Sequence, residues 1–150
     1  MRKFLIIIVS LLFVVSGCST SNDESYELDL DAFYSDSLEQ GFFNNELYVG
    51  LNSNLNNLFG DIDFIDAKVG TNTGANANIL AVFETDDIES LDKTITYYLE
   101  DTKEKYESYQ PEEVEKIKNA TKVVKGRYLI LIICDNYENV ETYLNNYLAN

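Results

Sequence analysis

The chain has 150 residues and a formal net charge of −15, with 26 acidic side chains, 11 basic side chains and no histidine. This charge argues against a nucleic-acid partner, because nucleic-acid binding depends on lysine and arginine side chains that neutralise phosphates. The lack of histidine excludes the usual Ser-His-Asp and Cys-His catalytic sets and zinc sites that use histidine.

Residues 1–17 are typical of a cleaved secretory signal. Arg2 and Lys3 precede an apolar run from Phe4 to Val15, and small residues follow. An apolar helix of about 12 residues spans roughly 18 Å, whereas the hydrocarbon core of a bilayer is about 30 Å thick. We therefore interpret this stretch as a signal peptide and not as a transmembrane helix.

The end of this signal, Val15-Ser16-Gly17-Cys18, resembles the lipobox of bacterial lipoproteins. The resemblance implies cleavage before Cys18, a diacylglycerol thioether on its sulfur and often an acyl chain such as palmitate on its amine. Two acyl chains hold a protein firmly on a membrane, so the expected location is the extracytoplasmic face of the cell membrane. Residues 18–27 then form the lipidated cysteine and a flexible tether, and residues 28–150 form one domain. The alternative is an ordinary signal with an incidental cysteine.

The first part of the domain predicts short elements. Apolar spacings of three and four residues predict an amphipathic helix within residues 28–40, and residues 54–59 predict another helical turn or two. Residues 62–69 predict a strand, and residues 78–84 predict a strand buried on both faces or nearly so. The glycine-rich stretch 70–74 joins these two strands as the turn of a hairpin.

The longest predicted helix follows the second strand. Asp86 and Glu89 resemble a capping box at its start. The residues behind them form one stripe at spacings of three and four: Ile88, Leu91, Ile95, Tyr98, Leu99, Thr102 and Tyr106. The tyrosines of this stripe could line a ligand groove, but packing against a core is the stronger interpretation.

The last part of the chain predicts a helix opened by Pro111 and running to about Ala120, because proline is favoured in a first helical turn. Two strands follow, over residues 121–124 and 127–134, with Gly126 supplying a positive φ at their hairpin. A C-terminal amphipathic helix ends the chain, with a capping box formed by Asp135 and Glu138.

The element order from Ile62 onward is β-β-α-α-β-β-α. This order favours an α+β fold with an antiparallel sheet of about four strands and helices packed on one face.

Four short motifs carry a family resemblance: Ile79-Leu80-Ala81-Val82-Phe83, Tyr109-Gln110-Pro111, Lys118-Asn119-Ala120 and Lys125-Gly126-Arg127-Tyr128. Together they resemble a domain of unknown function that is common in small lipoproteins of Gram-positive Firmicutes. The resemblance covers residues 76–150 best, and residues 28–60 fit it poorly. It implies a fold and a location, and it brings no catalytic residues.

A single cysteine and one basic turn in the domain are further candidates for a functional role. Cys134 ends an apolar strand, and it has no disulfide partner if Cys18 is lipidated. We therefore expect a buried cysteine and not a nucleophile, which would need a nearby base. The turn Lys125-Gly126-Arg127 is one of few basic spots, either solvated or facing an acidic partner.

Carboxylates are the remaining candidates for chemistry. They form two loose groups: Asp61, Asp63 and Asp66, and Asp29, Asp31 and Asp36. Paired carboxylates can hydrolyse glycosidic bonds, and Asp61-Ile62-Asp63 could contribute oxygen ligands to calcium, although EF-hand spacing is absent.

The favoured functional hypothesis is a membrane-tethered binding or interaction module in an envelope process, with an unknown protein or envelope partner. We expect no enzyme activity, cofactor or metal. The alternative is a carboxylate-based envelope hydrolase.

Overall fold

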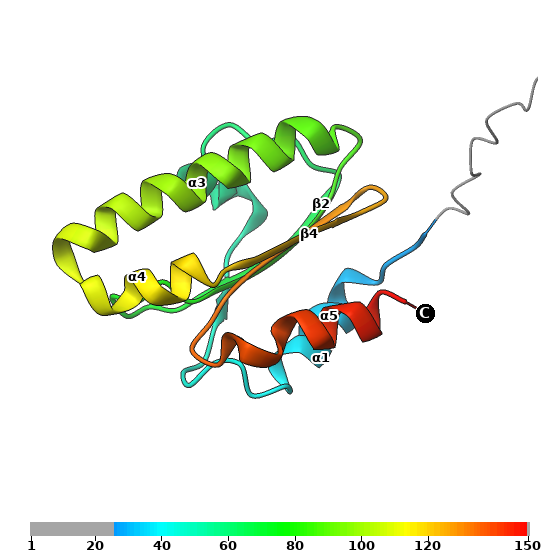
Figure 1. The fold of residues 1–150 in the computed structure, drawn as a ribbon. Helices are drawn as coiled ribbons and strands as arrows, with labels where there is room; N and C mark the ends of the chain where they lie inside the picture. The colour runs from blue at the N-terminus through cyan, green and yellow to red at the C-terminus, as the bar shows by residue number, and fades with distance from the viewer. Residues whose placement is uncertain (1–25, 150) are drawn as a thin grey trace, which may run out of the picture.

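Five antiparallel strands form one sheet in the order β1-β2-β3-β5-β4, in a computed structural model that describes residues 26–149 (Figure 1). The strands are β1 (Tyr48–Val49), β2 (Asp66–Thr71), β3 (Ile79–Glu84), β4 (Thr121–Lys125) and β5 (Tyr128–Ile133). The predicted signal peptide, Cys18 and most of the predicted tether lie outside the described residues. No helix among the described residues is long and apolar enough to cross a membrane.

The helices are α1 (Leu30–Leu38), α2 (Leu55–Phe59), α3 (Ile88–Tyr109), α4 (Pro111–Lys118) and α5 (Val140–Tyr147). Two short 3₁₀ helices, Asn52–Asn54 and Tyr137–Asn139, precede α2 and α5. The predicted α+β class, the antiparallel sheet and the long helix with its apolar stripe are confirmed.

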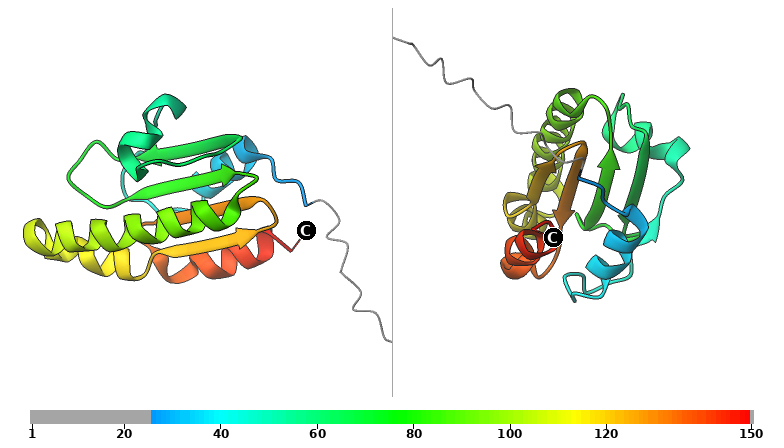
Figure 2. Two further views of the ribbon diagram at one scale, coloured as in Figure 1. Left: turned by 90° about the horizontal axis from the view of Figure 1, so that it is seen from above. Right: turned by 90° about the vertical axis from the view of Figure 1, so that its right-hand side faces the viewer.

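Helices cover both faces of the sheet, so the expected packing on one face is wrong (Figures 1 and 2). Side chains alternate between the two faces along each strand. In the two central strands, Leu80, Val82, Ile130 and Ile132 therefore face α1 and α5. Their neighbours Ile79, Ala81, Phe83, Leu129, Leu131 and Ile133 face α2, α3 and α4. The continuous apolar runs of β3 and β5 exist because each strand has a core on both sides.

The sheet has five strands and not about four, because the two-residue strand β1 pairs with the end of β2. The strand expected over residues 62–69 begins only at Asp66 and extends to Thr71. Gly70 therefore belongs to the strand and not to the turn. The ring of Tyr34 lies against it, and a Cβ at this position would overlap the Tyr34 hydroxyl. The predicted hairpin of β2 and β3 is confirmed.

Neither predicted capping box forms. Asp87 caps α3, accepting from the Ser90 amide at 3.0 Å, while Asp86 forms an ion pair with Arg127 at 2.9 Å. Asp135 caps no helix, because the 3₁₀ turn after it has no side-chain cap and the carboxylate is bonded elsewhere. At the β4–β5 turn, the expected positive φ of Gly126 is confirmed, at 57°.

The molecule has two distinct ends. At one end, Tyr26 packs against the β4–β5 hairpin: its ring lies 6.0 Å from that of Tyr128, and the Lys125 ammonium lies 4.5 Å above it. We call this the tether end. The opposite end carries the loop 72–78 and the junction of α3 and α4 at Gln110, and we call it the distal end (Figure 1). The described chain thus starts far from the distal end.

Candidate binding groove

The predicted carboxylate groups do not form a site among residues 26–149. Asp61, Asp63 and Asp66 are exposed. In the second group, Asp29 caps α1, Asp31 forms an ion pair with Lys68, and Asp36 accepts from the Tyr147 hydroxyl at 3.1 Å. The described part of the chain holds no group of three carboxylate or thiol side chains placed to bind a metal ion.

Cys134 is buried as expected, with 1% of its surface exposed. Burial raises the pKa of its thiol to about 11, so the reactive thiolate is scarce at neutral pH. The basic turn is also committed to local contacts. Arg127 pairs with Glu84 and Asp86, and Lys125 donates to the Leu148 carbonyl. Both features therefore have structural roles.

A groove at the distal end offers the most varied set of polar groups. It consists of two hollows of about 390 and 410 Å³ that share Lys105 and Tyr106. One wall is the C-terminal half of α3, and the other is formed by α2 and the loop 72–78. We call it the distal groove. Its amides and aromatic rings are Asn57, Asn72, Asn76, Asn78, Gln110, Tyr98, Tyr106 and Tyr109.

The α3 wall places tyrosines between the core and the groove. Tyr98 packs edge-on against Phe59, with ring centroids 4.7 Å apart. Burial raises the pKa of the Tyr98 and Tyr106 hydroxyls, which keeps them neutral. Tyr109 is different, because 84% of it is exposed. The tyrosine stripe thus packs against a core, as predicted, and also lines a groove.

The loop wall is shaped by its own asparagines. The Asn72 side chain accepts from the Gly74 amide and donates to the Glu46 carbonyl, and that of Asn76 accepts from the Asn78 amide at 3.1 Å. Asparagine bonds its own backbone in this way in many turns. In residues 26–149 no hydrogen bond uses the side-chain amide of Asn57 or Gln110 or the hydroxyl of Tyr109. These groups remain available to a ligand.

A partly buried ion-pair cluster fixes the base of this loop. The Lys116 ammonium lies 2.9 Å from Glu113 and 2.6 Å from Asp135, and these side chains are 11–17% exposed. The side-chain amide of Asn78 donates to Asp135 at 2.7 Å, and the backbone amide of Ala77 donates to Glu113 at 2.9 Å. We call these residues the Lys116 cluster. It connects α4, the end of β5 and the loop, so it holds one wall of the distal groove in place.

The charges of the cluster support each other. Burial by itself would lower the pKa of Lys116, but hydrogen bonds to Asp135 and Glu113 raise it overall. Burial would raise the pKa of Asp135, but donors from the Asn44 backbone, Lys116 and Asn78 lower it overall. Both groups are therefore ionised at neutral pH, as expected for a buried pair with further hydrogen bonds.

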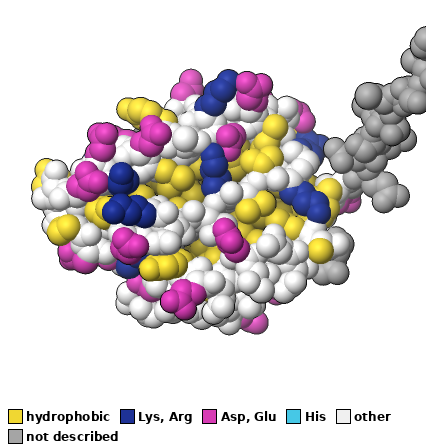
Figure 3. Space-filling view, in the orientation of Figure 1, with side chains coloured by type: hydrophobic (Ala, Val, Ile, Leu, Met, Phe, Trp, Pro, Cys, Tyr) yellow, Lys and Arg dark blue, Asp and Glu magenta, His cyan; other side chains and the backbone are white. Residues whose placement is uncertain are grey.

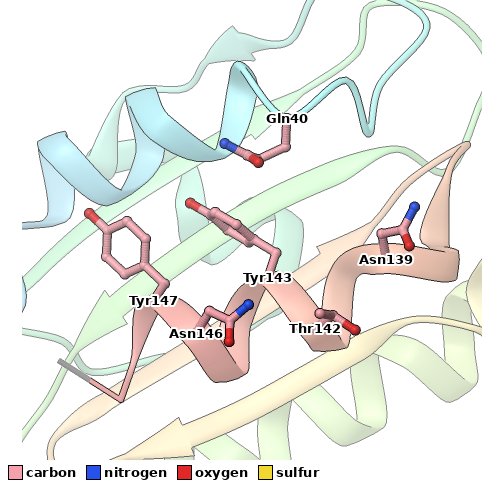
Figure 4. Close-up of a pocket in the computed structure, with 6 residues that line it drawn as sticks. All are labelled: Gln40, Asn139, Thr142, Tyr143, Asn146 and Tyr147. Carbon is pink, nitrogen blue, oxygen red and sulfur yellow. The ribbon is translucent and has the colours of Figure 1, made fainter.

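Another hollow, of about 450 Å³, lies between α1 and α5 (Figure 4). In Figure 4 the rings of Tyr143 and Tyr147 point from α5 toward α1. Their hydroxyls are already bonded there: that of Tyr143 to Ser37 at 3.0 Å and that of Tyr147 to Asp36 at 3.1 Å. This hollow is the seam between two packed helices. The distal groove is the better candidate site, which the sequence indicated only as the less favoured interpretation of the tyrosine stripe on α3.

The family comparison covers both walls of the distal groove. It matches residues 49–134, from the edge strand β1 to the end of β5, and leaves out α1 and α5. The match begins and ends earlier than the residues 76–150 expected from the four motifs. No curated protein and no solved structure is significantly similar to the chain. Since the matched range exceeds half of its length, the chain belongs to the family described as a domain of unknown function, DUF4358.

Proposed function

We propose that this protein is a lipoprotein, anchored through Cys18 on the extracytoplasmic face of the cell membrane, that acts by binding a ligand in the distal groove. The signal-like residues 1–17 and the lipobox-like Val15-Ser16-Gly17-Cys18 support the anchor. Nine residues run from Cys18 to Tyr26, and a flexible chain of that length spans about 16 Å. The domain therefore stays close to the membrane.

The observation that carries this proposal is the opposite placement of the two ends. Tyr26, where the tether enters, packs on the β4–β5 hairpin, whereas the loop 72–78 and Gln110 lie at the far end (Figure 1). An anchor at Cys18 therefore lets the distal groove point away from the lipid surface. This orientation suits a ligand in the envelope and leaves the groove open to it.

The groove favours binding over carboxylate-based hydrolysis. Its lining carboxylate, Asp101, forms an ion pair with Lys105. A two-carboxylate hydrolase needs a second acid facing the first across the substrate, with its pKa raised. Asp135, at the base of the groove wall, has its pKa lowered instead.

The anchor is tested by labelling cells with a palmitate analogue and separating membranes from soluble proteins. We expect label and membrane location in the wild type and the loss of both in Cys18→Ala. Membrane location that persists without label in Cys18→Ala would contradict lipid anchoring.

The binding role is tested by photo-crosslinking in cells. A crosslinking amino acid at Tyr109 probes the groove, and one at Val124, which is 45% exposed on the edge strand β4, is the matched control. We expect a specific product at position 109 that weakens in Cys18→Ala. If position 109 gives no product under several growth conditions, or only the products of position 124, the groove is not the binding site.

A further inference from the structure

We infer that the ligand of the distal groove is a neutral glycan chain. This inference rests on the proposed function and deepens it by naming the ligand class. Three properties of the groove lead to it: its aromatic wall, its uncharged hydrogen-bonding groups and its lack of net charge.

The aromatic wall has the shape that sugar rings require. A sugar ring has an apolar C–H face and a polar edge, and a tyrosine ring likewise combines an apolar body with a polar tip. Tyr98, Tyr106 and Tyr109 follow one another along α3, over about 16 Å of helix at 1.5 Å per residue. This length suits a chain of rings better than one ring. Tyr109, 84% exposed, extends the wall beyond the core and offers an open aromatic face.

The opposite wall has the hydrogen-bonding groups that hydroxyls require. A sugar hydroxyl both donates and accepts. A side-chain amide also does both, whereas a carboxylate only accepts and an ammonium only donates. On this wall the side-chain amide of Asn57, and at the end of the α3 wall that of Gln110, line the groove and make no side-chain hydrogen bond within residues 26–149. In antibody binding sites, asparagine supplies adaptable hydrogen bonds and tyrosine supplies large, rigid contact area.

The charge of the groove argues against an ionic ligand. The chain as a whole carries −15, and Figure 3 shows acidic side chains spread over the visible face rather than gathered in one patch. In the groove, Asp101 and Lys105 neutralise each other. An anionic polymer would be repelled by the surrounding surface, and a basic partner would find no unpaired carboxylate here. A neutral ligand avoids both penalties.

The Lys116 cluster adds pre-organisation. Because Asn78 and Ala77 are bonded to Asp135 and Glu113, the loop wall is held in place before a ligand arrives. A site that is formed in advance loses less conformational entropy on binding.

The test is calorimetric titration of the full-length protein in a zwitterionic detergent that contains no sugar. The probes are two neutral β-1,4-linked hexasaccharides, one of glucose and one of N-acetylglucosamine, and a neutral hexapeptide. We expect at least one of the hexasaccharides to bind and Tyr109→Ala to weaken that binding by about tenfold. Tyr97→Ala is the matched control, because Tyr97 is 68% exposed on the same helix and does not line the groove.

The outcomes separate the two proposals. If neither hexasaccharide binds, or if Tyr109→Ala binds as the wild type does, the glycan inference is wrong. If crosslinking at position 109 still succeeds in that case, the groove remains a binding site for another class of ligand. Binding of the hexapeptide alone would assign it to peptides. If crosslinking at position 109 fails as well, the proposed function is also wrong.

Discussion

The two ends of this domain each carry a basic side chain between two carboxylates, but in different surroundings. At the distal end, Lys116 lies between Glu113 and Asp135, and all three side chains are 11–17% exposed. At the tether end, Arg127 lies between Glu84 and Asp86, and the exposed fractions are 43%, 22% and 84%. Similar ion pairs therefore contribute differently to stability, because ion pairs are strongly screened in water and weakly screened when buried.

The difference suggests that the two ends are stabilised by different interactions. The Lys116 cluster connects α4, the end of β5 and the loop 72–78, and so holds the wall of the distal groove. The Arg127 pairs sit on a hairpin turn that Gly126 already shapes through its positive φ. One end is fixed by charge and the other by backbone geometry and aromatic packing. The comparison can be tested at each end.

The largest expected effect is that of Lys116→Met. Removing the cation leaves Glu113 and Asp135 as partly buried carboxylates without their partner, which destabilises proteins by about 3–5 kcal/mol. Arg127→Met should lower the free energy of unfolding by about 1 kcal/mol or less, because its pairs are more exposed to water than those of Lys116. Urea unfolding followed by circular dichroism measures both. Equal losses of unfolding free energy in the two variants would contradict the proposed difference between the two ends.

The second prediction uses Cys134 as a reporter of the distal end. Its thiol is 1% exposed and its pKa is about 11, so alkylation at pH near 8 requires local opening. In a Cys18→Ala background we expect Lys116→Met to accelerate labelling by on the order of a hundredfold, the rate equivalent of about 3 kcal/mol. Arg127→Met should change the rate by less than about fivefold. Similar acceleration in both would show that opening is global and that the two ends are not independent.

The Lys116 cluster also shows what sequence patterns miss. Its charges come from α4 and from Asp135, the second residue after β5, and Asn78 precedes β3, so no local spacing joins them. Asp135 matched a capping pattern, but the buried Lys116 ammonium and the Asn44 amide offer it stronger partners. Asp87, and not Asp86 as predicted, caps α3 for a related reason, because Asp86 forms an ion pair with Arg127. Tertiary partners overrode local motifs in both places.

The fold followed more directly from the sequence. The sequence predicts that the apolar run of β3 is buried on both faces or nearly so, and such burial requires cover on both sides of the sheet. Economy of packing suggested one covered face, and this was wrong because α1 and α5 form their own core on the second face. The strand β1 was missed because two residues carry no alternation pattern. A groove lined by Tyr98 and Tyr106 was the less favoured interpretation, because both lie on the apolar stripe and look like core residues.

The third prediction concerns acid. The folded protein holds the pKa of Asp135 below its ordinary value near 3.8, so the unfolded chain binds this proton more readily. The stabilisation is fully present above that ordinary value and is lost as pH falls through the lowered pKa of the folded state. We expect wild-type stability to fall below about pH 4, and Asp135→Asn to be less stable at neutral pH but to lose less on acidification. Asp86→Asn at the tether end is the control. If the stability of Asp135→Asn falls with decreasing pH as steeply as that of the wild type, the Lys116 cluster is not the acid-sensitive element.

The smallest expected effect is at the tether end. The Lys125 ammonium lies 4.5 Å above the Tyr26 ring and donates to the Leu148 carbonyl, so it joins the start of the described chain to the end of α5. A cation over an aromatic ring at an exposed site contributes about 0.5–1 kcal/mol. We therefore expect Lys125→Ala to lower the free energy of unfolding by about 1 kcal/mol and to sharpen the Tyr26 ring signals in NMR spectra, while Lys125→Arg retains most of the contact. Resonances of the loop 72–78 should stay in place, because Tyr26 and the distal groove share no contact. If they shifted, the tether and the groove would be coupled, and anchoring at Cys18 could then influence binding directly as well as orient the groove.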